Sequence, residues 1–329
     1  MSAGTRRVLV TGGSGFIGTN LIETLAAEGL RLVNVDADAP RDARQAQHWV
    51  RCDILDRAEL ARIVVAERPT DVVHLAARTD VEGKTLADYR ANIEGTANVL
   101  DAVARAGSVL RLIVTSTQFV HQFHGTPAGD EDYAPYTVYG QSKVETERLT
   151  RAAGLACAWT IVRPTNIWGP WHPRYPHEFW RVLAGGKYAH PGRQPVLRSY
   201  GYVGNVVWQM LRFLALPPAD VAGRVFYVGD RPVNLLDWAN GFSRAQTGRD
   251  VRVVPRPLVR SLALVGDTLK AAKVAFPITT SRYRNMITGN PADMEATFAL
   301  LGEPPYSLDA GIAATVAWMR AHHPALVRI

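Results

Sequence analysis

From residue 7 to about residue 164, short runs of β-branched and other apolar residues alternate with longer stretches in which apolar residues recur at helical spacing. This alternation is typical of parallel strands joined by crossover helices. We therefore expect an α/β fold built on a doubly wound parallel sheet. The expected strands cover residues 8–10, 32–35, the region of residue 50, 72–75, 112–114 and 160–162.

The stretches between these strands have the period of amphipathic helices. Leu21, Ile22 and Leu25 fall on one face of the first helix, and Gly29 stands where a left-handed helix cap is expected. A second helix is expected over 89–103, a third from Tyr139 toward residue 154, and a last one over 308–322. These patterns predict secondary structure and do not indicate catalytic or binding residues.

The residue composition of the chain changes after Pro164. Tryptophan, glycine, proline and histidine crowd residues 168–176, which excludes a regular helix there. We expect residues 1–165 to form the first domain, with segments near 195–210 and 225–245 able to return to it, and residues 166–329 to form mainly a smaller substrate-binding domain. Most of the eight tryptophans are expected in the core, and Trp168 and Trp171 are expected to be exceptions because of their loop.

A glycine-rich turn separates the first strand from the first helix. Gly12, Gly15 and Gly18 have the spacing GxxGxxG, and Phe16 and Ile17 open the helix. Glycines allow positive φ and a close approach of the backbone, and a helix N-terminus favours a pyrophosphate. This strand, turn and helix predict a Rossmann-type dinucleotide site.

Asp36 ends the second expected strand, where a carboxylate can accept hydrogen bonds from the adenosine ribose hydroxyls. The negative charge predicts NAD rather than NADP, because a 2′-phosphate would be repelled. Arg41 and Arg44 follow closely and would soften that repulsion.

Tyr139 and Lys143 lie four residues apart at the start of an expected helix and therefore share a face. An ammonium and a bound nicotinamide cation would lower the pKa of the tyrosine, which is about 10 without neighbours. The strand over 112–114 runs into Thr115, Ser116 and Thr117, which places hydroxyls at the carboxyl end of a parallel strand. Such a hydroxyl can hold a reacting oxygen while Tyr139 moves its proton.

Composition narrows the class of protein further. The 329 residues include 37 Lys and Arg against 30 Asp and Glu, without a basic run of five, so nucleic-acid binding is disfavoured. Two isolated cysteines, Cys52 and Cys157, and no apolar run near the roughly 18 residues of a membrane span indicate a cytoplasmic protein without a membrane partner. No histidine pattern predicts a metal site or a serine hydrolase.

Taken in order, these motifs resemble the NAD-dependent epimerase/dehydratase family of the extended short-chain dehydrogenases/reductases. The resemblance covers most of the chain. It rests on TGGSGFIG at 11–18, Asp53-Ile54, HLAA at 74–77, Asn92, TST at 115–117, Tyr139 with Lys143, and RPTNIWGP at 163–170.

The resemblance implies roles for these residues. Thr117, Tyr139 and Lys143 would be catalytic, with Lys143 also holding the nicotinamide ribose. The other cofactor contacts implied are Asp53, Ile54, Leu75, Ala76, Ala77, Asn92 and Pro164. On the substrate side, Asn166 and Arg198 match residues that contact a nucleotide diphosphate in the family, although Ser199 replaces the usual acidic residue. Further substrate candidates are Thr79, Gln118, Arg174 and Arg284.

The leading hypothesis is an NAD-dependent epimerase of a nucleotide-linked sugar, which oxidises its substrate transiently and then reduces it again on the other face. A sugar or hydroxysteroid-type dehydrogenase or ketoreductase is the alternative. A 4,6-dehydratase is less favoured, because Gln118 and Phe119 stand where that subset has Asp-Glu. A non-enzymatic dinucleotide sensor is also less favoured, because the catalytic residues are intact. The family resemblance further implies a homodimer.

Overall fold

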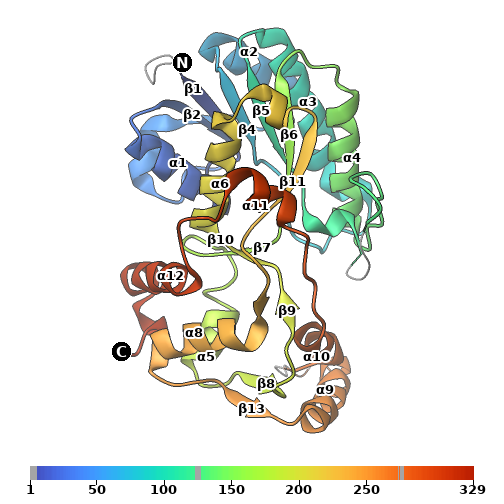
Figure 1. Cartoon of the computed structure of the whole chain (residues 1–329), viewed down its shortest axis with the longest axis vertical. Helices are drawn as coiled ribbons and strands as arrows, with labels where there is room; N and C mark the ends of the chain where they lie inside the picture. The colour runs from blue at the N-terminus through green and yellow to red at the C-terminus, as the bar shows by residue number, and fades with distance from the viewer. Residues whose placement is uncertain (1–5, 123–126, 273, 275–277) are drawn as a thin grey trace. The chain divides into compact units, whose positions relative to one another are not determined.

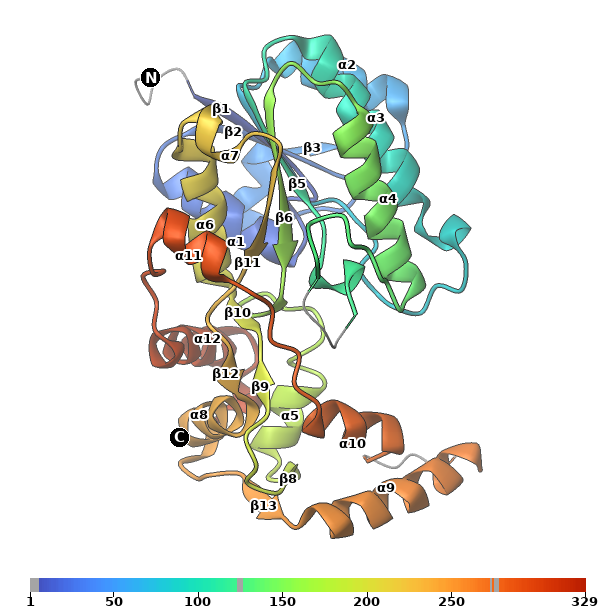
Figure 2. The same ribbon diagram turned by 45° about the vertical axis from the view of Figure 1, so that its right-hand side comes forward.

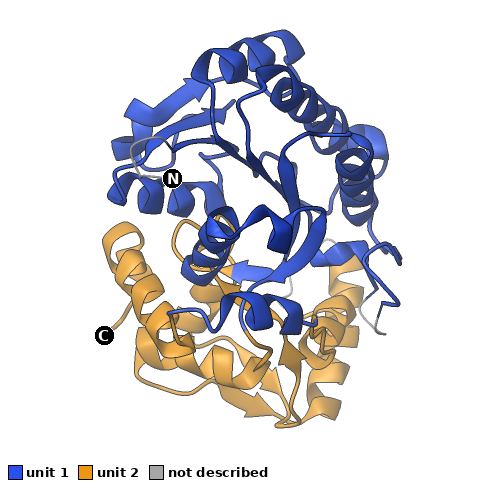
Figure 3. Ribbon diagram, turned by 45° about the horizontal axis from the view of Figure 1, so that its top comes forward, with its two compact units in different colours: residues 1–167, 203–230, 293–305 blue, residues 168–202, 231–292, 306–329 orange. Residues whose placement is uncertain are grey.

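The computed structural model describes residues 6–122, 127–272, 274 and 278–329. The chain divides into two compact units, coloured separately in Figure 3. Unit 1 comprises residues 1–167, 203–230 and 293–305, and unit 2 comprises residues 168–202, 231–292 and 306–329. Both units are therefore assembled from segments that are far apart in the sequence.

Unit 1 contains a parallel sheet of seven strands in the order β11-β6-β5-β4-β1-β2-β3. The order reverses beside β1, since β2 lies on one side of it and β4 on the other. A doubly wound sheet has its ligand crevice at such a switch point. The strands are β1 (Arg7–Thr11), β2 (Arg31–Asp36), β3 (Trp49–Arg51), β4 (Asp71–His74), β5 (Arg111–Thr115), β6 (Ala158–Pro164) and β11 (Arg224–Val228).

Helices cover both faces of this sheet, as Figure 1 shows. Three helices, α2 (Arg57–Glu67), α3 (Arg90–Ala106) and α4 (Val138–Ala152), pack side by side on one face. On the other face lie α1 (Phe16–Ala27) and α6 (Val203–Ala215). Short helices α7 (Pro218–Val221) and α11 (Glu295–Leu301) and three 3-10 turns, η2 (Ala43–His48), η3 (Leu86–Tyr89) and η4 (Gln118–Val120), complete the unit.

The α/β fold and the six strands expected in the first half of the chain are confirmed. Gly29 follows α1 with φ +69°, the left-handed conformation expected of it. One expectation was wrong in detail, because Tyr89 belongs to the 3-10 turn η3 and α3 begins at Arg90. The Tyr89 ring is fully buried and its hydroxyl donates to the Asp80 carbonyl, which holds the turn before the helix.

Unit 2 is built around aromatic side chains. Its helices are α5 (Phe179–Ala184), α8 (Leu235–Thr247), α9 (Arg256–Ala271), α10 (Thr280–Ile287) and α12 (Leu308–His322), and η5 (Pro324–Leu326) follows the last of them. Its strands are β8 (Ala189–Pro191), β9 (Leu197–Arg198), β10 (Tyr200–Tyr202), β12 (Val233–Asn234) and β13 (Arg252–Val254), and β7 (Asn166–Trp168) crosses the boundary along the sequence.

The expectation that Trp168 is a loop residue outside the core was wrong. Its indole is fully buried and packs against Tyr202, Trp238 and Phe242, with ring centroids 5.1, 6.2 and 5.2 Å away. The cause is tertiary, because β10 and α8 supply the rings that enclose it. Trp171 lies in the following loop with φ +68° and contacts the Trp318 ring.

None of the described helices is long and apolar enough to cross a membrane.

Candidate active site

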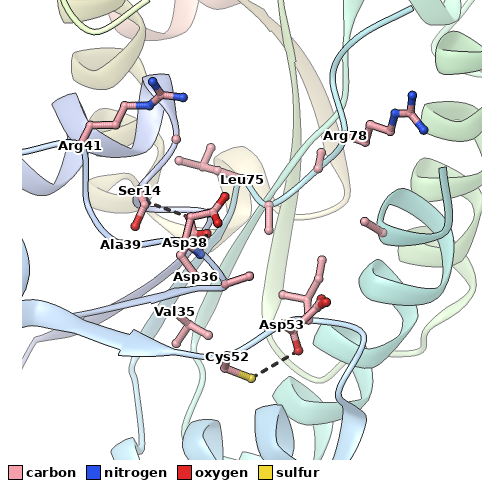
Figure 4. A pocket seen from close by; sticks show the side chains of 17 residues that line it. Ser14, Val35, Asp36, Asp38, Ala39, Arg41, Cys52, Asp53, Leu75 and Arg78 are labelled. Atoms are coloured by element: carbon pink, nitrogen blue, oxygen red, sulfur yellow. Dashed lines mark hydrogen bonds between the residues drawn. The ribbon is translucent and has the colours of Figure 1, made fainter. Parts of the chain in front are cut away.

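A pocket of about 550 Å³ opens at the carboxyl ends of β1, β2 and β4, at the switch point of the sheet (Figure 4). It is therefore placed where a doubly wound sheet binds its ligand. Seventeen residues line it: Gly12, Ser14, Gly15, Val35, Asp36, Ala37, Asp38, Ala39, Arg41, Cys52, Asp53, Ile54, Leu75, Ala76, Ala77, Arg78 and Ala91.

The glycine turn is shaped by close backbone packing. Gly12 has φ +76°, and a Cβ there would lie 2.5 Å from the backbone nitrogen of Ala76. A Cβ on Gly18 would lie 2.3 Å from the Gly12 carbonyl oxygen. The glycines thus let the turn, the loop after β4 and the start of α1 meet without side chains between them.

The first turn of α1 contains Phe16, Ile17 and Gly18. Among the described residues, no side chain caps this N-terminus, and the first turn contains no acidic residue. The positive end of the helix dipole is therefore not neutralised locally, which suits a phosphate. The turn and helix fit the pyrophosphate of a dinucleotide.

Asp36 points into the pocket from the end of β2 (Figure 4). Its two oxygens accept backbone hydrogen bonds from Ser14 and Asp38, each 3.0 Å long. Burial raises the pKa of this carboxyl, and the backbone hydrogen bonds act in the opposite direction. Of the two arginines expected to soften its charge, Arg41 lines the pocket, whereas Arg44 is bound to Asp42 with Nη2–Oδ2 of 2.6 Å.

We expect Asp36→Ser to weaken NAD binding. We also expect it to lower the ratio of NAD affinity to NADP affinity by about tenfold, because the carboxylate that repels the 2′-phosphate of NADP is removed while Arg41 remains. Fluorescence titration with both dinucleotides measures this. Asp38→Ser removes the neighbouring carboxylate of the same pocket and serves as the matched control, with its preference unchanged. Equal affinities of the unmodified chain for NAD and NADP would contradict the assignment.

Eight of the predicted cofactor contacts line the pocket: Gly12, Gly15, Asp36, Asp53, Ile54, Leu75, Ala76 and Ala77. The other seven predicted contacts are not among the lining residues: Phe16, Ile17, Gly18, Asn92, Tyr139, Lys143 and Pro164. Asn92 is fully buried and accepts from the Arg78 amide at 2.8 Å, while its own amide donates to the Arg78 carbonyl and to Ser142 Oγ. It therefore holds the pocket loop at Arg78 against α3 and α4.

Sequence reasoning missed several lining residues, among them Ser14, Asp38 and Arg78. Arg78 directly follows the expected HLAA motif, and its guanidinium pairs with Asp80 at 2.7 Å. A signal was present in the sequence, since Ser14 and Arg78 adjoin predicted residues and Asp38 lies two positions after Asp36.

The three predicted catalytic residues all belong to unit 1 and are buried. Thr117 follows β5 and caps η4, and Tyr139 and Lys143 lie on one face of α4. Their exposed fractions are 6%, 7% and 2%. Thr137 caps α4 by accepting from the Gly140 amide, which sets where the helix begins.

This burial shifts the pKa values of Tyr139 and Lys143. Burial raises the pKa of Tyr139 to about 12, and a hydrogen bond with Thr117 opposes the rise. Burial lowers the pKa of Lys143 to about 8, opposed by the charge of Glu147. The pKa of Tyr139 thus moves opposite to the direction expected from the sequence, because burial outweighs the hydrogen bond with Thr117.

Near the predicted catalytic residues lies a buried ion pair that sequence reasoning missed. Glu147, one turn beyond Lys143 on α4, binds Arg163 of β6 at 2.8 Å, and both side chains are at most 1% exposed. Ser116 Oγ and the Tyr133 hydroxyl donate to the same carboxylate, at 2.5 and 2.9 Å. Arg163 donates from both Nε and Nη2, at 2.9 and 2.8 Å, so the carboxylate accepts four hydrogen bonds. Three of them tie α4 to β6 and to Ser116, which follows β5.

The arginine of this pair is also enclosed by groups from other segments. Its Nη2 donates to the Asp130 carbonyl, and its guanidinium lies 5.8 and 5.7 Å from the ring centroids of Tyr133 and Tyr227. Although burial favours its neutral form, the hydrogen bond and charge of Glu147 raise the pKa of Arg163 above its usual range. The guanidinium therefore keeps its charge beside Glu147, and its Nε and Nη2 are hydrogen bonded.

The predicted substrate residues are divided between the two units. Thr79, Gln118 and Asn166 belong to unit 1, where Gln118 Nε2 is buried without a hydrogen-bond partner among the described residues. Arg174, Arg198 and Arg284 belong to unit 2. Arg198 is buried and donates to the backbone carbonyl and side-chain oxygen of Asn285. Arg284 is exposed on α10.

In the described ranges, no group of three or more His, Cys, Asp or Glu is arranged to hold a metal ion. His74, the last residue of β4, is buried between Thr11 and Thr96 and bonds to both. Burial lowers its pKa to about 3, which keeps it neutral.

Comparison with known proteins adds a family match. Residues 8–229 match the model of the NAD dependent epimerase/dehydratase family. A 3 beta-hydroxysteroid dehydrogenase/Delta 5-->4-isomerase of Mycobacterium tuberculosis is 31% identical over 255 residues, which are 71% of this chain and 67% of the relative.

Two further proteins are similar. The N-acetyl-alpha-D-glucosaminyl-diphospho-ditrans,octacis-undecaprenol 4-epimerase of Escherichia coli is 31% identical over 210 residues, covering 61% of this chain and 60% of the relative. The structure of the UDP-glucuronic acid 4-epimerase from Bacillus cereus, in complex with UDP-glucuronic acid and NAD, has a TM-score of 0.72 at 20% identity. The match covers 96% of this chain and all of that one (100%).

Proposed function

The chain belongs to the NAD-dependent epimerase/dehydratase family, and we propose that it is an NAD-dependent epimerase of a nucleotide-linked sugar. The observation that carries the proposal is the pairing of two features in unit 1. One is the pocket at the switch point of the sheet, lined by the glycine turn and Asp36, and the other is the buried set of Thr117, Tyr139 and Lys143. The likeness to sugar epimerases supports it.

The residues of the pocket fit NAD. Gly12, Gly15 and the start of α1 would hold the pyrophosphate, Asp36 the adenosine ribose, and Asp53 and Ile54 the adenine side. When bound, the nicotinamide supplies a reversible acceptor for hydride. Its positive charge also favours the ionised form of a buried tyrosine.

Each catalytic residue has a distinct task in this proposal. Tyr139 takes the proton of the reacting hydroxyl, while Thr117 donates a hydrogen bond to its oxygen. Lys143, kept near Tyr139 on α4, favours the phenolate and holds the nicotinamide ribose. The carbon loses its hydride and becomes a ketone, which turns over and regains hydride on its opposite face. Tyr139 then returns the proton, so no cofactor is consumed.

A second candidate is net oxidoreduction, as in a hydroxysteroid-type dehydrogenase or ketoreductase. The similarity to a 3 beta-hydroxysteroid dehydrogenase favours it. Two residues of unit 2 also favour it. Ser199 stands where the family usually has an acidic residue, and Arg198, which would contact a nucleotide diphosphate, is hydrogen bonded to Asn285. Dehydration is disfavoured because Gln118 and Phe119 cannot supply the acid and base that elimination needs.

The proposal includes a homodimer in the cytoplasm. The family resemblance implies that α3 and α4 of two copies form a four-helix bundle, and these two helices pack side by side on one face of unit 1.

A panel of UDP-, GDP- and dTDP-sugars incubated with the protein and NAD tests the reaction. We expect one sugar to give a new epimer by NMR without net NADH absorbance. Stoichiometric NADH would move the assignment to a dehydrogenase. No reaction with any nucleotide sugar, together with intact NAD binding, would overturn the sugar substrate and leave the cofactor assignment standing.

A further inference from the structure

Helix α9 of unit 2 is labelled in Figure 2. Three of its apolar side chains form a stripe that is exposed to solvent. Leu258, Leu262 and Val265 recur at spacings of four and three residues and are 54%, 38% and 51% exposed. Another face of the same helix is buried, with Val259 and Ala263 packed against Tyr283 of α10. The stripe is therefore not the side on which α9 is anchored.

Exposed apolar surface is concentrated in this part of the molecule. Among the described residues, thirteen large hydrophobic side chains are exposed, and five of them lie between residues 258 and 274. Single exposed apolar residues need no explanation, but the three of the stripe, at spacings of four and three residues, form one row of the kind that marks a contact surface. The five are Leu258, Leu262, Leu264, Val265 and Val274.

Positive charge is concentrated in the same segment. Residues 256–287 contain six Lys or Arg and one acidic residue, Asp267, giving a net charge of +5. The whole chain has a net charge of +7, so the other residues together contribute only +2. Arg260 and Lys270 of α9 and Arg284 of α10 are exposed.

We propose that α9, with the basic residues around it, binds the surface of an anionic lipid bilayer. A helix with an apolar stripe and neighbouring Lys and Arg lies in the interface plane, burying the stripe among the acyl chains and pairing its charges with headgroups. A second copy of the chain is a poorer occupant, because it would bring two segments of net charge +5 together. With 16 residues, α9 lies on the bilayer and does not span it.

This contact is distinct from the features that sequence reasoning considered. The expectation of no membrane partner rested on the lack of a spanning run, which says nothing of a helix lying at the surface. The inference does not depend on the substrate proposed above, since it uses no residue of the dinucleotide pocket or the catalytic set.

Flotation of the purified full chain with vesicles tests the proposal. We expect it to float with vesicles of phosphatidylcholine and phosphatidylglycerol, and much less with phosphatidylcholine alone. Added salt should weaken the binding, because the charge contribution is screened.

Substitutions separate the apolar contribution to vesicle binding from the electrostatic one. Leu262→Ser with Val265→Ser should reduce binding at least tenfold, because two apolar side chains no longer enter the bilayer. Arg260→Gln and Lys270→Gln should each reduce it about fivefold, and only for anionic vesicles. Val65→Ser with Leu110→Ser changes two equally exposed side chains of unit 1 and should leave binding unchanged.

Each variant is checked for NAD binding, which reports an intact fold. No flotation of the unmodified chain with either vesicle would overturn the proposal. It would also be overturned if the stripe variant kept its flotation but changed its sedimentation mass, a result that would assign the stripe to a second copy.

Discussion

Replacing Tyr139 with phenylalanine is expected to lower kcat by about 10² to 10⁴-fold, the usual contribution of a positioned acid–base group. The side chain is 7% exposed and its hydroxyl bonds to Thr117, so removing that oxygen leaves the packing intact and deletes only the proton acceptor. The measurement is turnover of the panel substrate that the unmodified chain converts. NAD affinity is measured in parallel and should change little.

Tyr89 offers a matched control for this substitution. Its ring is also buried, with its centroid 6.1 Å from that of Tyr139, but its hydroxyl is bound to the Asp80 carbonyl at 2.8 Å. Tyr89→Phe should therefore cost about 1 kcal/mol of stability and leave kcat within a few-fold. Full turnover by the Tyr139→Phe variant would refute the proton-transfer role and leave the cofactor pocket unaffected.

Replacing Arg163 with methionine is expected to lower the free energy of unfolding by about 3–5 kcal/mol, because it leaves the Glu147 carboxylate buried without its cation. The same change should lower kcat. The pair joins α4 to β6 directly beside Lys143, and Ser116 of the network adjoins Thr117. Urea denaturation followed by circular dichroism measures the loss.

Two further variants test whether the unpaired buried charge causes this loss of stability. The double variant Arg163→Met with Glu147→Gln should recover part of the stability, because no uncompensated charge remains. Arg62→Met breaks an exposed pair with Glu59 on α2, whose side chains are 67% and 37% exposed, and should change the free energy of unfolding little because solvent screens the pair. A loss at Arg163 as small as that at Arg62 would contradict the role given to the buried pair.

The parts of the site that lie within one local element could be predicted from the sequence. The glycine turn and Asp36 are encoded by a strand, a turn and the next strand, and Tyr139 and Lys143 by four residues of helical spacing. Eight of the predicted cofactor contacts do line the pocket. Their neighbours Ser14 and Arg78 were missed because a motif names types of residue and not the loop surface around them.

The Glu147–Arg163 network could not be predicted in this way. Its members come from α4, β6, the residue after β5 and the loop at Tyr133, and Ser116 is 31 residues away from Glu147 along the chain. In the sequence, Glu147 reads as one more polar position of an amphipathic helix. Only the folded chain shows that this position faces inward and meets an arginine.

The sequence by itself determined the α/β class, the positions of the first six strands and the dinucleotide turn, because hydrophobic period and glycine spacing are local properties of the chain. The tertiary structure decided what depends on burial. It enclosed Trp168 in an aromatic core and raised the pKa of Tyr139, and it left one apolar face of α9 exposed while burying another. Burial depends on which distant segments pack together, and a pattern along one segment does not contain that information.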